Sequence, residues 1–284
     1  METIEAIMKL NKIFKTNNWT EKDIDEFVFD NFCKLINNLD NSQRALIIEL
    51  TEKYKWISYT DYNSRVLSTI DSIELEKLQD LKTVYLFPII KREDEGKFKS
   101  GQFLIYQIKS FKRHLKNYNG ITFKYISKFD DLKEENLKLK NNEALFLIDD
   151  YIGSGETLNF CLDELRVNPS ISNDKINIIS LASQNEIYEK LKAEGIAFYT
   201  DFISKKGISD NYSPPLLQEK IEIMLEIEKM IPGGSHYTLG YNQSEALITM
   251  VRTPDNTFPI FWKTYKKGSQ KFDAPFSREE TIEL

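Results

Sequence analysis

Two adjacent aspartates, Asp149 and Asp150, are the residues of this chain whose type and spacing point most directly to chemistry. They follow the apolar run 144–148, which is typical of a strand buried on both faces of a parallel sheet. Two like charges side by side repel each other, and without a ligand or a cation such a pair is a poor structural choice. We therefore interpret both aspartates as candidate catalytic residues that hold the hydroxyl groups of a ligand.

The segment after the acids, residues 152–157, has the composition of a loop that binds phosphate. Gly153 and Gly155 allow backbone angles that other residues avoid, so that successive N–H groups can converge on one point. A helix is expected to begin near Glu156, where its dipole adds positive potential. The predicted phosphate-binding residues are Ile152, Gly153, Ser154, Gly155, Glu156 and Thr157.

The stretch 144–158 as a whole resembles the ribose-5-phosphate loop of type I phosphoribosyltransferases: an apolar run, two acids, and small residues that end in Gly-x-Thr. The resemblance implies that Asp149 and Asp150 contact the ribose of phosphoribosyl pyrophosphate (PRPP) or of a nucleoside 5′-monophosphate. It also implies Mg²⁺ as cofactor, which these acids would hold through ribose hydroxyls or water. Family members that act on 6-oxopurines have an aspartate at the position of Gly153, so we expect a different acceptor or a proton acceptor elsewhere.

The resemblance also assigns a pyrophosphate-binding loop after the first core strand. The matching residues here are Lys91 and Arg92, which follow the apolar run 83–90. The polar segment 93–101 is then expected to act as a lid. Charged residues after a strand are also commonly a solvated loop, and this alternative stays open.

The segment 253–262 is similar to the ending of a divergent phosphoribosyltransferase-like group found near bacterial conflict and phage-defence genes. This resemblance bears on context rather than chemistry. It implies a phage-defence effector that transfers phosphoribosyl to an unknown acceptor.

Strands and helices alternate from about residue 83, which predicts an α/β fold with a doubly wound parallel sheet of the type I phosphoribosyltransferase kind. The predicted strands begin at 83, 121, 144, 176 and 196, and the predicted core helices cover 102–115, 156–167 and 184–194. We expect a helical accessory region at 1–80, the core at 81–230, and a β-rich tail at 231–284. In that tail, 246–251 and 258–262 read as a hairpin.

Other interpretations compete for the loop. It resembles the Gly-Ser-Gly-x-Thr turn of S-adenosylmethionine (SAM)-dependent methyltransferases, but the next strand, 176–183, ends without the acid that such enzymes place there. Glu156 stands where a phosphate loop of the NTPase kind needs lysine. An ordinary strand–turn–helix connection and a non-catalytic nucleotide-sensing module remain alternatives.

The composition excludes several classes of protein. A net charge of −6 offers no electrostatic case for nucleic-acid or membrane binding, and no apolar run approaches the ~20 residues of a membrane span. Cys33 and Cys161 form no disulfide or metal pattern, and His114 and His236 lie far apart. We expect a cytoplasmic protein, with a homodimer and a partner protein on the N-terminal helices as open alternatives.

Overall fold

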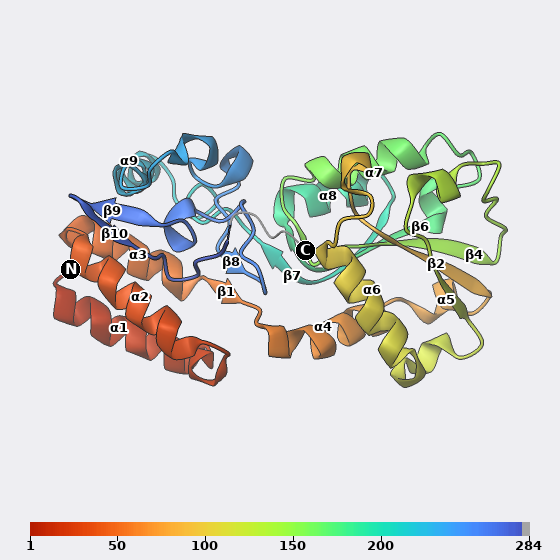
Figure 1. Cartoon of the computed structure of the whole chain (residues 1–284), viewed down its shortest axis with the longest axis horizontal. Helices are drawn as coiled ribbons and strands as arrows, with labels where there is room; N and C mark the ends of the chain where they lie inside the picture. Colours follow the sequence, from red (N-terminus) through yellow and green to blue (C-terminus); the bar gives the residue numbers. More distant parts are fainter. Residues whose placement is uncertain (280–284) are drawn as a thin grey trace. The chain divides into compact units, whose positions relative to one another are not determined.

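The computed structural model describes residues 1–279, which form two compact units (Figure 1). One unit contains Met1–Thr60 and the described residues from Ser204 onward, and the other contains Asp61–Ile203. This division differs from the predicted boundaries at 80 and 230. Residues 61–80 join the α/β unit because buried side chains of their helix, such as Val66, pack there and Tyr118 Oη donates to the carbonyl of Ile70 at 2.9 Å. Residues 280–284 of the predicted tail lie outside the described part.

The α/β unit is built on a largely parallel sheet, which confirms the predicted fold class. Its strands are β2 (Thr83–Pro88), β3 (Thr122–Tyr125), β4 (Glu143–Ile148), β5 (Tyr151–Ile152), β6 (Ile176–Gln184) and β7 (Ala197–Ser204). The order is β3-β2-β4-β6-β5, and β7 also pairs with β6. The β2–β3, β2–β4, β4–β6 and β5–β6 pairs are parallel.

Helices cover both faces of this sheet. They are α4 (Tyr59–Asp71), α5 (Leu75–Leu78), α6 (Ser100–Phe111), α7 (Glu156–Leu165) and α8 (Asn185–Ala193), with short 3-10 helices η2 (Arg92–Asp94), η3 (Lys112–His114), η4 (Lys116–Tyr118), η5 (Phe129–Leu132) and η6 (Asn173–Lys175). Leu145 and Leu147 of β4 share a buried core with α7 and α8, whereas α6 contacts β2 and β4 from the opposite side (Figure 1). Alternate residues of β4 thus face the two helical layers, as expected of a strand buried on both faces.

The other unit begins with the predicted N-terminal helical region, which is confirmed. Its helices are α1 (Thr3–Thr16), η1 (Trp19–Glu21), α2 (Asp25–Asn38), α3 (Asn41–Glu52) and α9 (Leu216–Glu228). A capping box forms at Asp40 and Gln43 of α3. The spacing of Thr20 and Asp23 is also that of a capping box, but no such box opens α2, because Thr20 lies inside η1 and α2 begins at Asp25, after Ile24.

The hairpin predicted at 246–262 is also wrong. Within that stretch β8 (Ile248–Thr249) pairs in parallel with β1 (Lys55–Trp56), and η9 (Pro259–Phe261) replaces the second predicted strand. Proline at the first position of a helical turn is favoured because its missing N–H is not needed there. A hairpin does occur further on, between β9 (Tyr265–Lys267) and β10 (Gln270–Phe272), after η7 (Gly234–Tyr237) and η8 (Tyr241–Gln243).

Across residues 1–279, the helices are all too short or too polar to cross a lipid bilayer.

Candidate functional site

The backbone of the two aspartates is fixed at the end of β4. The N–H of Asp149 donates to the carbonyl of Ile179 at 3.2 Å, and the carbonyl of Asp150 accepts the N–H groups of Leu181 and Ala182, both at 3.0 Å. The strand before them is buried, whereas the aspartates themselves are only half-buried. The sheet therefore holds two neighbouring carboxylates at its carboxyl end, where ligands bind in folds of this kind.

Helix α6 supports the first carboxylate. Ser100 Oγ donates to Asp149 Oδ1 at 2.6 Å, and the same oxygen accepts the N–H of Asp150 at 2.9 Å. Gly101 permits this close approach, because a Cβ at that position would lie 2.4 Å from the carbonyl oxygen of Ile148. Ser100, at the start of a helix that the sequence also offers as a weaker anion site, is thus a candidate site residue that positions Asp149.

Helix α4 supports the second carboxylate. Tyr62 Oη donates to Asp150 Oδ2 at 2.8 Å, and the Tyr62 side chain is 1% exposed. The helix belongs to a segment predicted as an accessory region, and no local pattern links Tyr62 with an acid 88 residues later. The only sequence signal is its place on the apolar face of α4.

Desolvation and mutual repulsion perturb both acids. Burial raises the pKa of Asp149 well above its ordinary range, the charge of Asp150 raises it further, and the hydrogen bond from Ser100 opposes the shift. Burial also raises the pKa of Asp150, against the hydrogen bond from Tyr62. A cation or a set of hydroxyl donors would stabilise the ionised form of the pair. Acids with pKa values perturbed in this way are common at ligand sites.

The loop after the acids runs into α7 as predicted, and α7 begins at Glu156. Gly155 has a φ of +77°, and a Cβ there would lie 2.5 Å from Ile187 Cδ1, so that only glycine fits without rearrangement. Ile152 and Gly153 are buried and Thr157 is half-buried, whereas Ser154 and Glu156 are exposed. The glycine N-cap contributes no side-chain acceptor. Ser154 Oγ accepts the N–H of Glu156 at 3.4 Å, and the N–H groups that follow in the first turn are suited to an anion.

The two predicted cations have different surroundings. Lys91 forms an ion pair with Glu156, which brings its ammonium to the first residue of α7. Arg92 pairs with Glu164, further along α7, and with Asp130 at 3.3 Å. The structure therefore brings Lys91 to the loop, while the guanidinium of Arg92 lies among acids outside it.

The acid pair fits a magnesium ion whose other ligands come from water or from the substrate. Within residues 1–279, no group of three or more His, Cys, Asp and Glu side chains is arranged to hold a metal. Mg²⁺ commonly binds through one or two carboxylates and keeps waters or substrate phosphates as its other ligands. Asp149 and Asp150 supply such carboxylates, and their mutual repulsion favours a cation.

A comparison with models of protein families identifies the family of this chain. A family model described as PRTase-CE matches residues 9–278. The chain belongs to the PRTase-CE family. This is a phosphoribosyltransferase family associated with conflict systems, and the match confirms the resemblance inferred from the sequence. No curated protein matches the PRTase-CE chain.

Two solved structures show a distant likeness to this PRTase-CE chain. Hypoxanthine-guanine phosphoribosyltransferase from Schistosoma mansoni, in complex with IMP, is 13% identical, with a TM-score of 0.29 over 51% of this chain and 64% of that enzyme. A hypothetical protein from Neisseria gonorrhoeae with bound ppGpp is 14% identical, with a TM-score of 0.32 over 60% of this chain and 96% of that protein. The chain therefore spans less than two thirds of the S. mansoni enzyme. Both TM-scores are low, so neither likeness supports an argument about the site.

Proposed function

We propose that this PRTase-CE protein binds PRPP, or a nucleoside 5′-monophosphate in the reverse direction, together with Mg²⁺, and transfers the phosphoribosyl group to an acceptor. The observation that supports this most is the sequence of groups at the end of β4. Two half-buried carboxylates stand directly before a glycine loop that presents Ser154 at the start of α7. Within a phosphoribosyltransferase family, this is the arrangement that a ribose with a 5′-phosphate requires.

Each part of the site has a role in this proposal. Asp149 and Asp150 accept hydrogen bonds from the ribose hydroxyls, and the amides and hydroxyls of residues 152–157 bind the 5′-phosphate. Lys91 exchanges its partner Glu156 for the pyrophosphate of the substrate. Arg92 is assigned to the same pyrophosphate, since its ion pairs with the exposed Asp130 and the half-buried Glu164 lie at the surface and contribute little to stability.

The reaction places positive charge on the sugar. The bond between C1 of the ribose and the pyrophosphate oxygen breaks, the electron pair leaves with pyrophosphate, and a nucleophile of the acceptor bonds to C1. Bound Mg²⁺ would neutralise charge on the leaving group. The protein holds the ribose rigidly and places negative charge near the developing cation, which are contributions of orientation and electrostatics rather than covalent catalysis.

The acceptor is a further part of the proposal. Gly153 stands where family members that act on 6-oxopurines carry an aspartate, which supports an acceptor other than such a purine. The association of the family with conflict systems supports a role as a phage-defence effector.

Turnover tests the proposal. The full-length protein is incubated with labelled PRPP, Mg²⁺ and a panel of bases and nucleotides, and release of pyrophosphate is measured. Acceptor-dependent release is expected. Binding of PRPP without release would contradict transfer and favour the nucleotide-sensing module, which retains the same loop. Binding of SAM in place of PRPP would overturn both and support the methyltransferase, against the family match.

A further inference from the structure

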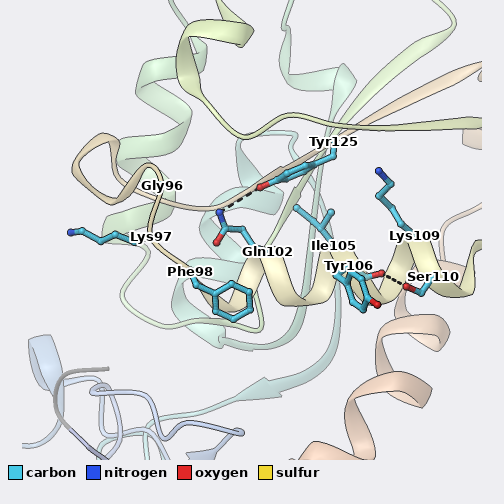
Figure 2. Close-up of a pocket in the computed structure, with 9 residues that line it drawn as sticks. All are labelled: Gly96, Lys97, Phe98, Gln102, Ile105, Tyr106, Lys109, Ser110 and Tyr125. Atoms are coloured by element: carbon cyan, nitrogen blue, oxygen red, sulfur yellow. Dashed lines mark hydrogen bonds between the residues drawn. The ribbon is translucent and has the colours of Figure 1, made fainter. Parts of the chain in front are cut away.

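A second candidate site lies along α6 and the segment before it. It is a pocket of about 660 Å³ whose lining does not include the two aspartates (Figure 2). Its lining residues are Gly96, Lys97, Phe98, Gln102, Ile105, Tyr106, Lys109, Ser110 and Tyr125. This volume is in the range of pockets that hold small organic ligands.

Three aromatic side chains around this pocket are exposed to solvent. Phe98, Tyr106 and Tyr125 are 61%, 71% and 41% exposed. Figure 2 shows Tyr125 and Phe98 on either side of Gln102, with the amide of Gln102 directed to the Tyr125 hydroxyl at 3.4 Å. Single exposed aromatics are ordinary, but three around one hollow mark a surface that binds something flat and apolar.

The charge of the lining is positive. Lys97 and Lys109 are both exposed, and the lining residues named above include no acid. Lys97 pairs with Asp94 at 3.0 Å, whereas Lys109 forms neither an ion pair nor a side-chain hydrogen bond with any residue in 1–279. The pocket therefore combines aromatic faces with at least one lysine that is available to an anion.

We propose that this pocket binds a nucleotide, whose base stacks on the aromatic side chains and whose phosphate contacts Lys109 and Lys97. Aromatic rings stack on every base, because every base has a π-face. The amide of Gln102 accepts the N–H of Lys99 at 2.8 Å and donates to Tyr125, which leaves its second hydrogen and second lone pair for a base edge. The net charge of −6 disfavours binding of a long nucleic-acid strand, so we expect the ligand to be a free nucleotide.

This site is distinct from the acid pair, although both use α6. Ser100, which holds Asp149, is the first residue of the helix, and Lys109 lies nine residues further on. At 1.5 Å per residue the backbone of Lys109 is about 13.5 Å from that of Ser100 along the axis, whereas Gln102, at the near edge of the pocket, is two residues from Ser100. The inference therefore does not depend on the proposed transfer reaction.

Calorimetric titration of the full-length protein with AMP tests the proposal, with adenosine and inorganic phosphate as partial probes. AMP is expected to bind at least tenfold more tightly than either partial probe. Tyr106→Ala should weaken AMP binding about tenfold, as expected for the loss of one stacking partner, and Lys109→Gln should weaken it several-fold. Both side chains are exposed, so neither variant removes a core contact.

Matched controls separate this site from the acid pair. Leu75→Ala and Lys138→Gln remove an exposed apolar side chain and an exposed charge outside the lining, and should leave AMP affinity unchanged. Because the acid pair is itself proposed to bind a nucleoside 5′-monophosphate, AMP is also titrated into Asp150→Asn, where one AMP should still bind and a second change, Tyr106→Ala, should remove that binding. If Asp150→Asn abolishes AMP binding and Tyr106→Ala does not, the nucleotide occupies the acid pair and the pocket proposal is overturned.

Other results also decide whether the pocket binds a nucleotide. Absence of AMP binding at millimolar concentration would overturn the proposal, as would an acidic peptide that binds through Tyr106 without competition from AMP. Tighter binding of a penta-deoxyadenylate strand than of AMP, lost in Tyr106→Ala, would support recognition of a base and a phosphate in the pocket, with a nucleic-acid strand as the ligand. AMP binding in the pocket of a protein that does not bind PRPP would refute the proposed function and leave this inference intact.

Discussion

Each unit of the molecule holds a pair of acidic side chains in fixed hydrogen bonds, buried in the helical unit and half-buried in the α/β unit, and the two pairs are held differently. In the helical unit Glu228 accepts the N–H of Leu239 with both oxygens, at 3.2 and 3.0 Å, and Glu245 accepts the N–H groups of Ile208 and Ser209 at 2.8 and 2.7 Å. These partners are mainly backbone amides. In the α/β unit the aspartates accept hydroxyl groups from Ser100 and Tyr62 instead.

The difference indicates which acids are structural. Glu228 and Glu245 are 8% and 3% exposed, and they fix a segment in which Leu239, Asn242 and Gln243 have left-handed backbone angles. Such carboxylates hold a costly loop conformation and have little surface left for a ligand. Asp149 and Asp150 are half-buried, and apart from the N–H of Asp150 on Asp149 their partners named above are side-chain hydroxyls that a ligand could displace. A raised pKa alone would not have separated Glu228 from the aspartates, because burial raises the pKa of all three.

The largest effect that tests this contrast is the dependence of stability on pH through Glu228. Burial raises the pKa of Glu228 from 4.5 to about 8, the charge of Glu245 adds to the shift, and the hydrogen bond from Leu239 opposes it. Between these two values the unfolded chain releases a proton that the folded chain retains. Stability should therefore fall, by on the order of 4 kcal/mol, as pH rises from about 5 to 8.

Urea unfolding at several pH values measures this decline. Glu228→Gln cannot ionise and should flatten it, whereas Glu219→Gln, an exposed change on the same helix, should preserve it. An equally steep decline in Glu228→Gln would show that Glu228 is not the titrating group.

Removal of the other structural acid should cost slightly less. Glu245→Ala leaves the N–H groups of Ile208 and Ser209 without their acceptor, and the free energy of unfolding should fall by about 3 kcal/mol. Chemical denaturation measures the loss, with the exposed Glu219→Ala as control. An unchanged midpoint would mean that these amides find other partners and that the contrast with the aspartates is weaker than we infer.

For the aspartates the opposite pattern is expected, with a loss of function and no loss of stability. Asp150→Asn should weaken PRPP binding about a hundredfold, or about 3 kcal/mol, because it removes a charged acceptor with little change of shape. It should leave the melting temperature equal or higher, since it also removes like-charge repulsion. Asp163→Asn, an exposed change on α7, is the matched control. Unaltered PRPP affinity would remove the main support of the proposed function.

A smaller effect is expected from the side chain that positions Asp150. Tyr62→Phe removes the hydroxyl that opposes the rise in the pKa of Asp150, so PRPP affinity should fall about fivefold, and more at pH 6 than at pH 8. Tyr118→Phe also removes a buried phenol, one that donates to the carbonyl of Ile70, and should leave affinity unchanged. Equal losses in the two variants would indicate a general packing defect.

The smallest effect distinguishes the two cations. Lys91→Gln should weaken binding of PRPP about threefold and leave ribose 5-phosphate binding unchanged, because its proposed partner is the pyrophosphate. Arg92→Gln should have a weaker effect, since its guanidinium lies with Glu164 and Asp130. A larger loss of affinity in Arg92→Gln than in Lys91→Gln would indicate that Arg92 makes the main contact with the pyrophosphate.

Local signals made the central part of the molecule predictable. The apolar run of β4 ends at two acids, and Gly155 precedes α7, so that strand, loop and helix start all follow from neighbouring residues. The alternation of strands and helices after residue 83 likewise follows from periodicity. The role of these residues in binding stays a prediction.

Contacts between distant residues were not predictable. Tyr62 meets Asp150 across 88 residues, and Arg92 meets Glu164 across 72. The hairpin proposed at 246–262 failed because the partner of β8 is β1, almost two hundred positions earlier, while Pro259 favours a helical turn. Turn-forming residues indicate where a chain bends but not which strand it then meets.

Gly101 has a consequence for reading related sequences. At Gly101 helix α6 comes so close to β4 that a Cβ would lie 2.4 Å from the carbonyl oxygen of Ile148. A relative with alanine or serine here would need a wider spacing between this helix and the sheet, and both the Ser100 contact and the Gln102 edge of the pocket would shift with it. The identity of this one residue in an alignment would therefore report on both proposed binding sites at once.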